Sequence, residues 1–345
     1  MEFVAQMAGQ KKYKIILIDV KKENDFLPLL PDVLAGYNMH RYVTYNLASF
    51  CRRYKAEFVN AYVKYIDIRA KMIILNSGTV VYDKLVIASG LKPDFYGQHD
   101  KYKDVFVINS IYSMKKLNDR LLGRSYKRCI VAGGGYTGIE AAGAFKRRFP
   151  GTEVVLVEKA PEILSFLPER LRKYALEKLT GAGIKVQTGA CVDEYISDES
   201  ILLWAAGVKG SECADSVMAK KTVNGRIIVR DDMRLGDNDN IYAIGDAAAV
   251  EFKGAVLRPC VPFAVQQGRF LAGFFKRGRV GRYKPFDPGY IIPAGNSAVG
   301  RVMGIYMKGK ALLLLHYLTA VLKSKGIRNR MGVFKSIFLK RRKNG

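Results

Sequence analysis

The fold is decided by CIVAGGGYTG at residues 129–138 and by TEVVLVE at residues 152–158. The first stretch begins as an apolar strand, turns through glycines and leads into a helical segment. The second stretch is another apolar strand, and it ends on an acid. The glycines fit GxGxxG at Gly133, Gly135 and Gly138, and the acid follows the last of them by 20 positions. This order of elements predicts a dinucleotide-binding unit of the Rossmann type.

Each part of this motif has a physical reason. The first glycine permits a tight turn, the second lets the backbone approach a pyrophosphate, and the third lets the helix pack on the strand. N–H groups at the start of the helix then face the phosphates. Glu158, the final acid, accepts hydrogen bonds from ribose hydroxyls and repels a 2′-phosphate, so NADH is favoured over NADPH. A glycine turn in an α/β domain without a ligand is the alternative for an isolated motif.

Length and composition set the frame for this unit. The 345 residues are 49% hydrophobic, which is enough for about two domains with sizeable cores. The five cysteines form no CxxC pair, and the three histidines, His40, His99 and His316, lie far apart in the sequence. We therefore predict no zinc ribbon and no other metal site.

Charge is distributed unevenly along the chain. The formal net charge is +26, and no acidic residue follows Asp287. A basic C-terminal segment favours an anionic surface, and both nucleic acid and acidic lipid headgroups fit that description. The longest apolar stretch, residues 311–322, is shorter than the roughly 20 residues that a spanning helix needs.

The N-terminal region contains a second, less complete pattern. Residues 2–9 are typical of the end of a helix, and residues 14–19 form an apolar strand that closes on Asp19. If Asp19 is a ribose-binding acid, the spacing places its glycine turn before Met1, so we expect this first unit to be incomplete. The alternative is that Asp19 only ends a strand. Further strands are predicted at residues 57–68, 72–75 and 84–88.

Several later segments carry a resemblance to a known family. They are Trp204-Ala-Ala-Gly207, the strand 241–244 that runs into Gly245-Asp246, Gln266-Gln267-Gly268 and Gly326-Ile-Arg-Asn-Arg330. With the two acid-ended strands, they resemble the two-dinucleotide flavoprotein oxidoreductases and, among these, the type II NADH dehydrogenases, the single-subunit NADH:quinone oxidoreductases.

The resemblance implies an α/β fold with two Rossmann-like dinucleotide-binding domains, the first incomplete, and a C-terminal amphipathic helical segment that attaches to a membrane. Its implied boundaries are 1–108 with 230–287 for the FAD-binding domain, 109–229 for the NAD-binding domain and 288–345 for the membrane segment.

The resemblance also implies site residues. Glu140 lies between flavin and nicotinamide, although an acid in the first turn of a helix is favoured by the helix dipole in any case. The FAD-binding residues implied are Asp19, Val63, Gly245, Asp246 and Ala247. The NAD-binding residues are Gly133, Gly135, Gly138, Glu158 and Gly207. The quinone-site residues are Pro262, Phe263, Gln266 and Gln267.

The activity implied is hydride transfer from NADH to FAD, followed by electron transfer to a membrane quinone. The protein is then a peripheral protein on the cytoplasmic face of the cell membrane, with an anionic membrane surface and a second copy in a homodimer as partners and no nucleic acid. Two alternatives stay open: a sulfide:quinone oxidoreductase that uses cysteines such as Cys129 and Cys260, and a non-catalytic flavoprotein fragment whose basic surface binds nucleic acid.

Three departures from the family pattern are visible. The glycine turn expected before Asp19 is not in the sequence, and residues 191–203 are shorter than the usual hairpin. Val261-Pro262 stands where the family carries Ala-Gln.

Apolar residues at helical spacing near the C-terminus predict an interfacial helix pair, with a domain core or a dimer surface as the alternative. These residues are Leu312, Leu315, Leu318, Leu322, Phe334, Ile337 and Phe338, followed by the basic cluster 340–343.

Overall fold

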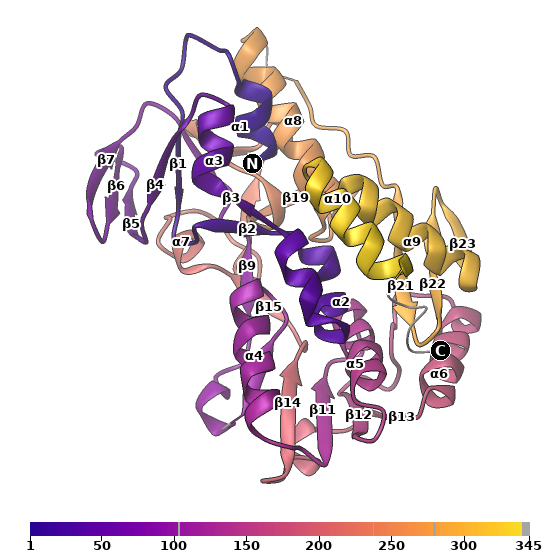
Figure 1. The fold of residues 1–345 in the computed structure, drawn as a ribbon. Coiled ribbons are helices and arrows are strands. Elements are labelled where there is room, and N and C mark those ends of the chain that lie inside the picture. Colours follow the sequence, from indigo (N-terminus) through magenta and orange to yellow (C-terminus); the bar gives the residue numbers. More distant parts are fainter. Residues whose placement is uncertain (103, 237, 279–280, 340–345) are drawn as a thin grey trace. The chain divides into compact units, whose positions relative to one another are not determined.

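A computed structural model describes residues 1–102, 104–236, 238–278 and 281–339. The chain forms two compact units that interleave along the sequence (Figure 1). The first unit comprises Met1–Asn24, Tyr45–Lys92 and Val208–Asp287. The second comprises Asp25–Thr44, Pro93–Gly207 and Pro288–Gly345. The α/β class that the sequence predicts is confirmed.

The unit boundaries differ from the predicted ones at 108/109 and 229/230. Strand β10 (Val105–Val107) pairs in parallel with β14 (Ser200–Trp204), so it belongs to the sheet of the second unit. Strand β16 (Ile227–Val229) pairs in parallel with β19 (Ala248–Phe252), which places it in the first unit. The segment after residue 287 is part of the second unit and not a separate module.

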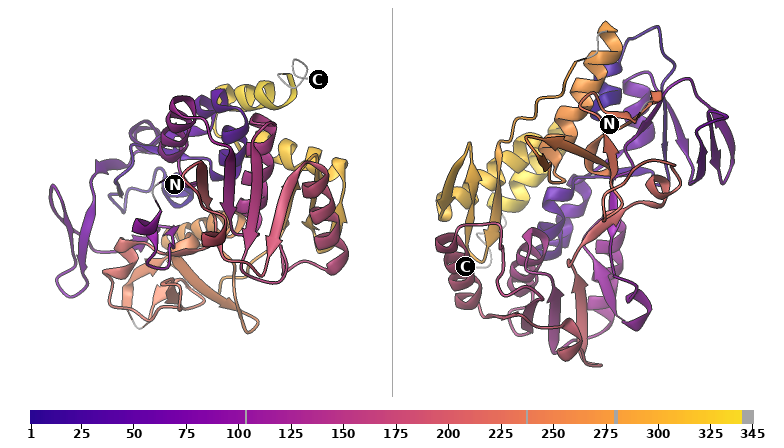
Figure 2. Two further views of the ribbon diagram at one scale, coloured as in Figure 1. Left: turned by 90° about the horizontal axis from the view of Figure 1, so that it is seen from below. Right: turned by 180° about the vertical axis from the view of Figure 1, so that it is seen from behind.

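The second unit is built around a parallel five-stranded sheet in the order β10-β14-β11-β12-β13, several strands of which lie side by side in Figure 2. Its other strands are β11 (Arg128–Ala132), β12 (Glu153–Glu158) and β13 (Ile184–Thr188), and its helices are α2 (Leu30–Ala35), α4 (Ile111–Gly123), α5 (Tyr136–Arg148) and α6 (Glu169–Gly181).

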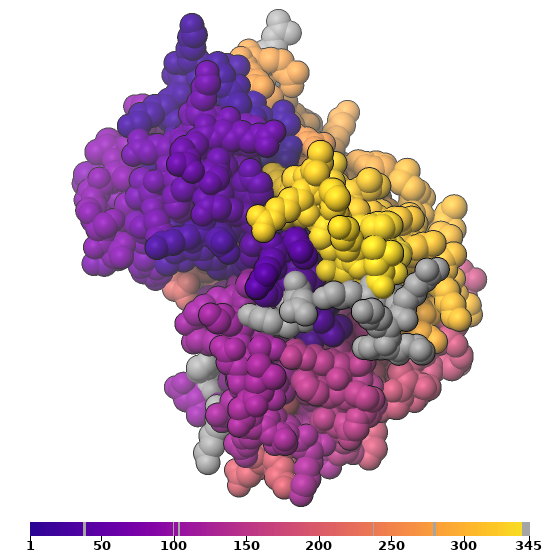
Figure 3. Space-filling model, viewed as in Figure 1, coloured from indigo at the N-terminus to yellow at the C-terminus, as the bar shows by residue number. Residues whose placement is uncertain are grey.

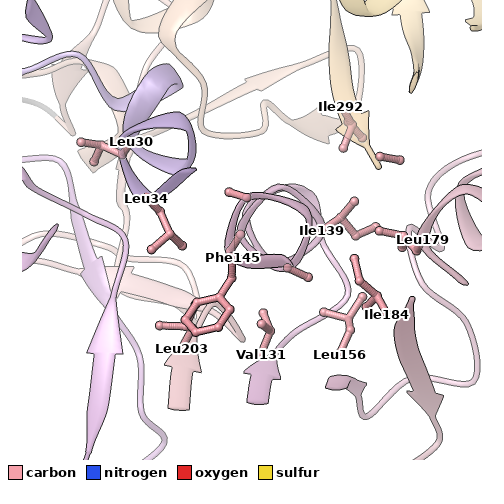
Figure 4. Packing of buried hydrophobic residues seen from close by; sticks show 14 of the residues in the cluster. Leu30, Leu34, Val131, Ile139, Phe145, Leu156, Leu179, Ile184, Leu203 and Ile292 are labelled. Carbon is pink, nitrogen blue, oxygen red and sulfur yellow. The ribbon is translucent and has the colours of Figure 1, made fainter. Parts of the chain in front are cut away.

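Helix α5 fixes the packing of this unit. Its small residues and Ile139 and Phe145 are buried, because one face of the helix lies on the apolar strands of the sheet. Figure 4 shows Phe145 and Ile139 among Val131 of β11, Leu156 of β12 and other buried side chains. The glycine turn at the start of α5 is therefore attached to a rigid core.

The C-terminal segment continues this core. Antiparallel strands β21 (Gly289–Ala294), β22 (Ser297–Val302) and β23 (Ile305–Lys308) are followed by α9 (Lys310–Lys323), α10 (Ile327–Phe334) and a π-helical turn. Leu312 and Ile337 are buried in the same cluster as α5, so these two members of the predicted apolar stripes belong to the domain core. No helix among the described residues is long and apolar enough to cross a bilayer.

The first unit contains several small sheets. Its helices are α1 (Glu2–Met7), α3 (Leu47–Arg53), α7 (Glu212–Asp215) and α8 (Val261–Arg277). Its other strands are β1 (Ile16–Asp19), β4 (Glu57–Asn60), β5 (Val63–Asp67), β6 (Met72–Leu75), β7 (Gly78–Val81), β8 (Leu85–Ile87), β15 (Val208–Gly210), β17 (Arg234–Leu235), β18 (Asn238–Ala243) and β20 (Ala255–Val256). Strands at the crossings between the units are β2 (Glu23–Asp25), β3 (Thr44–Asn46) and β9 (Leu91–Pro93).

The single strand predicted at 57–68 is wrong, because the chain changes partner within it. β4 pairs in parallel with β1, whereas β5 pairs antiparallel with β6. The amide of Asn60 donates to the carbonyls of Asp19 and Val20 at 2.9 Å each, which ends the first pairing.

Candidate functional site: two nucleotide-binding turns

The glycine turn of the second unit requires glycine at both ends. A Cβ on Gly138 would lie 1.8 Å from the carbonyl oxygen of Gly133, so helix and turn touch directly. Gly133 has φ +105°, and its Cβ would lie 2.6 Å from the carbonyl oxygen of Ala205. Both contacts are with backbone, which cannot move aside as a side chain can. The predicted roles of the first and third glycines in packing agree with this geometry.

Gly135 differs from these two glycines. A Cβ there would meet no atom within 4 Å, and its φ of −84° is one that any residue adopts. It is the residue immediately before α5, where the unpaired N–H groups of the helix are available to an anion. Open space beside this backbone is what a pyrophosphate needs, so the residues present fit a bound dinucleotide.

Glu158 ends β12 beside this turn. Its Oε2 accepts a hydrogen bond from the Gly134 N–H at 2.5 Å, and its Oε1 accepts one from the Ala160 N–H at 2.8 Å. A carboxylate has about four acceptor positions, so capacity for ribose hydroxyls remains. Gly134 is a residue that the sequence analysis missed: its Cβ would lie 2.8 Å from the Ile163 side chain.

Gly207 lies in a turn that packs against the same glycines. The Ala205 N–H donates to the carbonyl of Ala132 at 2.8 Å, which joins the turn to the end of β11. Because β11, β12 and β14 are parallel neighbours, their carboxyl ends meet at one edge of the sheet. The second unit therefore brings all the predicted NAD-binding residues to this edge.

Glu140 lies in α5 just after its first turn, which contains no acidic residue, so the helix dipole does not account for this acid. Burial raises the pKa of its carboxyl well above the ordinary value, the charge of Asp32 raises it further, and Arg147 opposes both. Asp32 itself accepts from the Tyr317 hydroxyl at 3.0 Å and lies 3.7 Å from the Arg147 guanidinium. The surroundings of Glu140 consequently favour the protonated form of its carboxyl.

The first unit contains a second turn, Gly245-Asp246-Ala247, at the end of β18. Gly245 has φ +71°, and Ala247 is fully buried. Burial raises the pKa of the Asp246 carboxyl, while the charge of Arg226 and the N–H of Cys260 lower it. A half-buried carboxylate with acceptor positions left over suits a ligand that carries hydroxyl groups, such as the ribityl chain of FAD.

Arg226 holds this turn, and the sequence analysis did not single it out. Its side chain donates to three carbonyls, those of Asp246 at 3.0 Å, Leu257 at 2.8 Å and Ala248 at 2.5 Å. The residue is only 5% exposed, and burial lowers the pKa of its guanidinium. The only sequence signal was an arginine between Gly225 and an apolar strand.

Both predicted quinone-site glutamines have partners within the first unit. Gln267 is buried, and its Oε1 accepts from the Gly245 N–H at 2.6 Å, so it supports the Gly-Asp turn. Gln266 exchanges two hydrogen bonds with the backbone of Phe286, at 2.7 and 2.9 Å. Phe263 is buried under the Arg258 guanidinium, 5.2 Å from the ring centroid, and Pro262 is half-buried in the first turn of α8.

The other two predicted FAD-binding residues lie at strand ends of the first unit. Asp19 ends β1, and its Oδ1 accepts from the Lys21 N–H at 2.8 Å. Burial raises the pKa of this carboxyl, and the Lys21 N–H opposes the shift. Val63 begins β5 and pairs with Leu75.

The cysteines do not support a dithiol mechanism. All five are free, and Cys129 is fully buried in β11, where burial raises its thiol pKa well above the ordinary value. Reactive thiolates need a lowered pKa. Among the described residues, no group of three histidine, cysteine or acidic side chains is arranged to hold a metal ion.

An α/β sheet with a glycine cradle and an acid-ended strand, together with a Gly-Asp turn, defines a dinucleotide-dependent oxidoreductase. The chain belongs to the pyridine nucleotide-disulphide oxidoreductase family, whose sequence pattern matches residues 3–268. The family resemblance that the sequence carries is confirmed.

Individual relatives of the chain have narrower names than the family as a whole. The type II NADH:quinone oxidoreductase of Staphylococcus haemolyticus is 27% identical over 340 residues, which cover 86% of this chain and 84% of that protein. NDH2 of Plasmodium falciparum has a similar fold, with a TM-score of 0.84, 16% identity and coverage of 100% of this chain and 96% of that one. CoADR-RHD of Bacillus anthracis has a TM-score of 0.78 at 20% identity, over 87% of this chain and 58% of that one.

Proposed function

We propose that the protein is an NADH:quinone oxidoreductase that uses FAD. The observation that carries this proposal is the open backbone at Gly135 beside Glu158, in a chain whose curated relatives are named type II NADH:quinone oxidoreductases. When bound, FAD supplies a centre that accepts a hydride from NADH and gives electrons to a quinone.

On the NADH side, we assign to residues of the second unit the binding and orientation of the dinucleotide. N–H groups at the start of α5 bind the pyrophosphate beside Gly135, and Glu158 accepts from the adenosine ribose. Glu158 already holds the Gly134 N–H, so the same carboxylate shapes the turn and selects NADH over NADPH. Gly207 lines the dinucleotide from the neighbouring strand end.

On the flavin side, Asp246 would accept from the ribityl hydroxyls of bound FAD, and Ala247 would offer its N–H to the cofactor. Asp19 accepts from the adenosine ribose, and the backbone of Val63 meets the adenine. Arg226 and Gln267 position the turn that carries Asp246.

We assign to Glu140 the role of donating the proton that quinone reduction consumes. Reduction of a quinone to a quinol by NADH consumes one proton from the medium, since NADH brings two electrons and only one proton. A raised pKa favours the protonated form of this carboxyl, which makes Glu140 the candidate proton donor, at Oε1 or Oε2. Pro262, Phe263 and Gln266 at the start of α8 are the remaining candidates for contact with the quinone.

A quinone dissolved in a membrane requires the protein to contact the lipid surface. The second unit has an exposed apolar surface that suits this contact. α9 and α10 expose Leu318, Leu322, Ile327, Met331 and Phe334, which are between 41% and 77% exposed. Figure 3 shows these C-terminal elements, in yellow, at the molecular surface.

A hollow of about 310 Å³ lies on this surface and is lined by Val321, Arg330, Met331, Phe334, Lys335 and Leu339. Apolar side chains flanked by cations suit the headgroup boundary of an anionic leaflet. We place the protein peripherally on the cytoplasmic face on this basis. The predicted basic cluster 340–343 lies outside the described residues, and a homodimer stays a prediction that sedimentation will test.

The function is tested by NADH oxidation with a short-chain quinone after reconstitution with FAD. We expect quinone-dependent oxidation of NADH, with NADPH a much poorer donor. Binding of NADH without any quinone reduction would contradict the proposal, and sulfide-dependent flavin reduction would favour the sulfide:quinone alternative.

Membrane attachment is tested by Leu322→Glu with Ile327→Glu, which leave the core residues of α9 and α10 in place. We expect less binding to anionic vesicles and unchanged oxidation of NADH by a water-soluble acceptor. Leu122→Glu, at a 75% exposed site on α4, is the matched control. Equal vesicle binding by all three proteins would exclude this surface.

A further inference from the structure

A second layer of contacts stands behind the Gly207 turn. Residues 94–96 and 204–207 of the second unit are joined by three hydrogen bonds. The Asp94 N–H donates to the Gly207 carbonyl at 3.1 Å, and the Trp204 indole N–H donates to the Asp94 carbonyl at 2.8 Å. The Tyr96 hydroxyl donates to the Ala206 carbonyl at 3.0 Å.

Tyr96 is an unusual member of this set. Its φ of +50° is in the left-handed region, which costs a non-glycine residue about 1 kcal/mol or more. Its side chain is 63% exposed, so burial does not hold it in place. The Tyr96 N–H donates to the Asp94 carboxylate at 3.0 Å, which fixes the backbone in this conformation.

The fit between Tyr96 and Gly207 is close. A Cβ on Gly207, at φ +149°, would lie 2.3 Å from the Tyr96 hydroxyl oxygen. The opposite side of the same turn contacts the glycine turn at residues 133–138, because a Cβ on Gly133 would lie 2.9 Å from the Cα of Ala206. Contact therefore runs without interruption from the Tyr96 hydroxyl through residues 206 and 207 to the glycine turn.

We propose that Tyr96 is a positioning residue for NADH, whose hydroxyl holds the 205–207 turn in the conformation that the bound dinucleotide needs. This inference rests on the proposed function and adds a residue to it. Without the hydroxyl the turn visits other conformations, and the apparent dissociation constant rises in inverse proportion to the fraction that is competent to bind. One neutral hydrogen bond limits the effect to roughly three- to tenfold.

The test is direct titration of NADH into Tyr96→Phe, followed by steady-state kinetics. We expect a roughly three- to tenfold higher Kd and KM for NADH, with kcat within about twofold and an unchanged melting temperature. Tyr112→Phe is the matched control, since Tyr112 is a 68% exposed tyrosine on α4 of the same unit. A raised KM with a nearly unchanged kcat indicates a positioning role, whereas a general loss of structure would lower kcat as well.

A second variant tests the route of the effect. In Gly207→Ala the new methyl group displaces the hydroxyl, so adding Tyr96→Phe to it costs little further affinity. Additive losses in the double variant would overturn the inference, as would NADH binding to Tyr96→Phe that equals or exceeds wild type. Wild-type protein that does not bind NADH would overturn the proposed function and this inference with it.

Discussion

The two turns that we propose as nucleotide-binding sites are held in different ways. The turn at Gly133–Gly138 is shaped by backbone in contact with backbone, where the absence of side chains lets chain segments touch. The turn at Gly245–Ala247 is shaped by hydrogen bonds from and to two buried side chains, Arg226 and Gln267. The glycines and the acid of the first turn form a recognisable sequence motif, whereas Arg226 and Gln267 of the second turn belong to none.

The largest effect is expected where a side chain holds a turn. Arg226→Met removes the hydrogen bonds that the guanidinium donates to the carbonyls of Asp246, Leu257 and Ala248, and we expect a loss of about 4 kcal/mol in the free energy of unfolding. FAD binding is lost with it. Denaturant titration and flavin content measure both effects.

Arg230→Met serves as the control, because Arg230 has a side chain that is 51% exposed in the same unit. If Arg226→Met were as stable as this control, the Gly245–Ala247 turn would be held by its backbone too, and the contrast between the two turns would fail.

The next effect compares two glycines of the same turn, Gly138, which we expect to matter for stability, and Gly135, which we expect to matter for NADH binding. Gly138→Ala drives a methyl group into the Gly133 carbonyl, so we expect about 3 kcal/mol of destabilisation and no NADH binding. Gly135→Ala places its methyl group in open space, so its stability stays within about 0.5 kcal/mol of wild type. NADH affinity nevertheless falls at least tenfold, or about 1.4 kcal/mol, because the methyl group occupies the place of the pyrophosphate. Denaturant titration distinguishes the two variants by their stability, and calorimetric titration measures the loss of NADH affinity; equal stability would contradict the assignment.

The local character of the glycine motif explains how much the sequence could predict. Gly133, Gly135, Gly138 and Glu158 are close in the chain, and their order alone specifies strand, turn, helix and strand. Gln267 shows the opposite case: its Oε1 accepts from the Gly245 N–H, and no sequence motif links these two positions.

The split of the predicted 57–68 strand has the same origin. Which neighbour a strand pairs with depends on tertiary structure, and apolar content on its own does not distinguish β4 from β5. In the C-terminal helices, helical periodicity identified apolar positions, but packing decided that Leu312 is core and Leu322 is exposed.

A smaller change is expected for cofactor choice. Glu158→Gln keeps an oxygen that accepts from the Gly134 N–H but removes the charge that opposes a 2′-phosphate. We expect the preference for NADH over NADPH to fall about tenfold, equivalent to about 1.4 kcal/mol. The ratio of kcat/KM for the two donors measures it, and an unchanged ratio would mean that Glu158 only supports the turn.

The smallest effect concerns Glu140 and depends on pH. Its pKa is higher in the folded protein than in the unfolded chain, so the folded state binds the proton more tightly. The stability that this carboxyl contributes is present at low pH and is lost as the pH rises through the folded pKa. Glu140→Gln removes this dependence, so its melting temperature should match wild type at low pH and exceed it increasingly as the pH rises. A constant difference across the range would contradict the assignment.

The interleaving of the two units has a consequence for how the protein is made. The second unit draws core residues from α2, from the central sheet and from β21, α9 and α10. During synthesis, the five-stranded parallel sheet leaves the ribosome long before Tyr317 and Val333, which complete its core. Apolar side chains on its helices stay exposed to solvent until then, since contacts between distant segments form late. Chaperone dependence at this stage, more than the stability of the finished fold, is then expected to limit the yield of active protein.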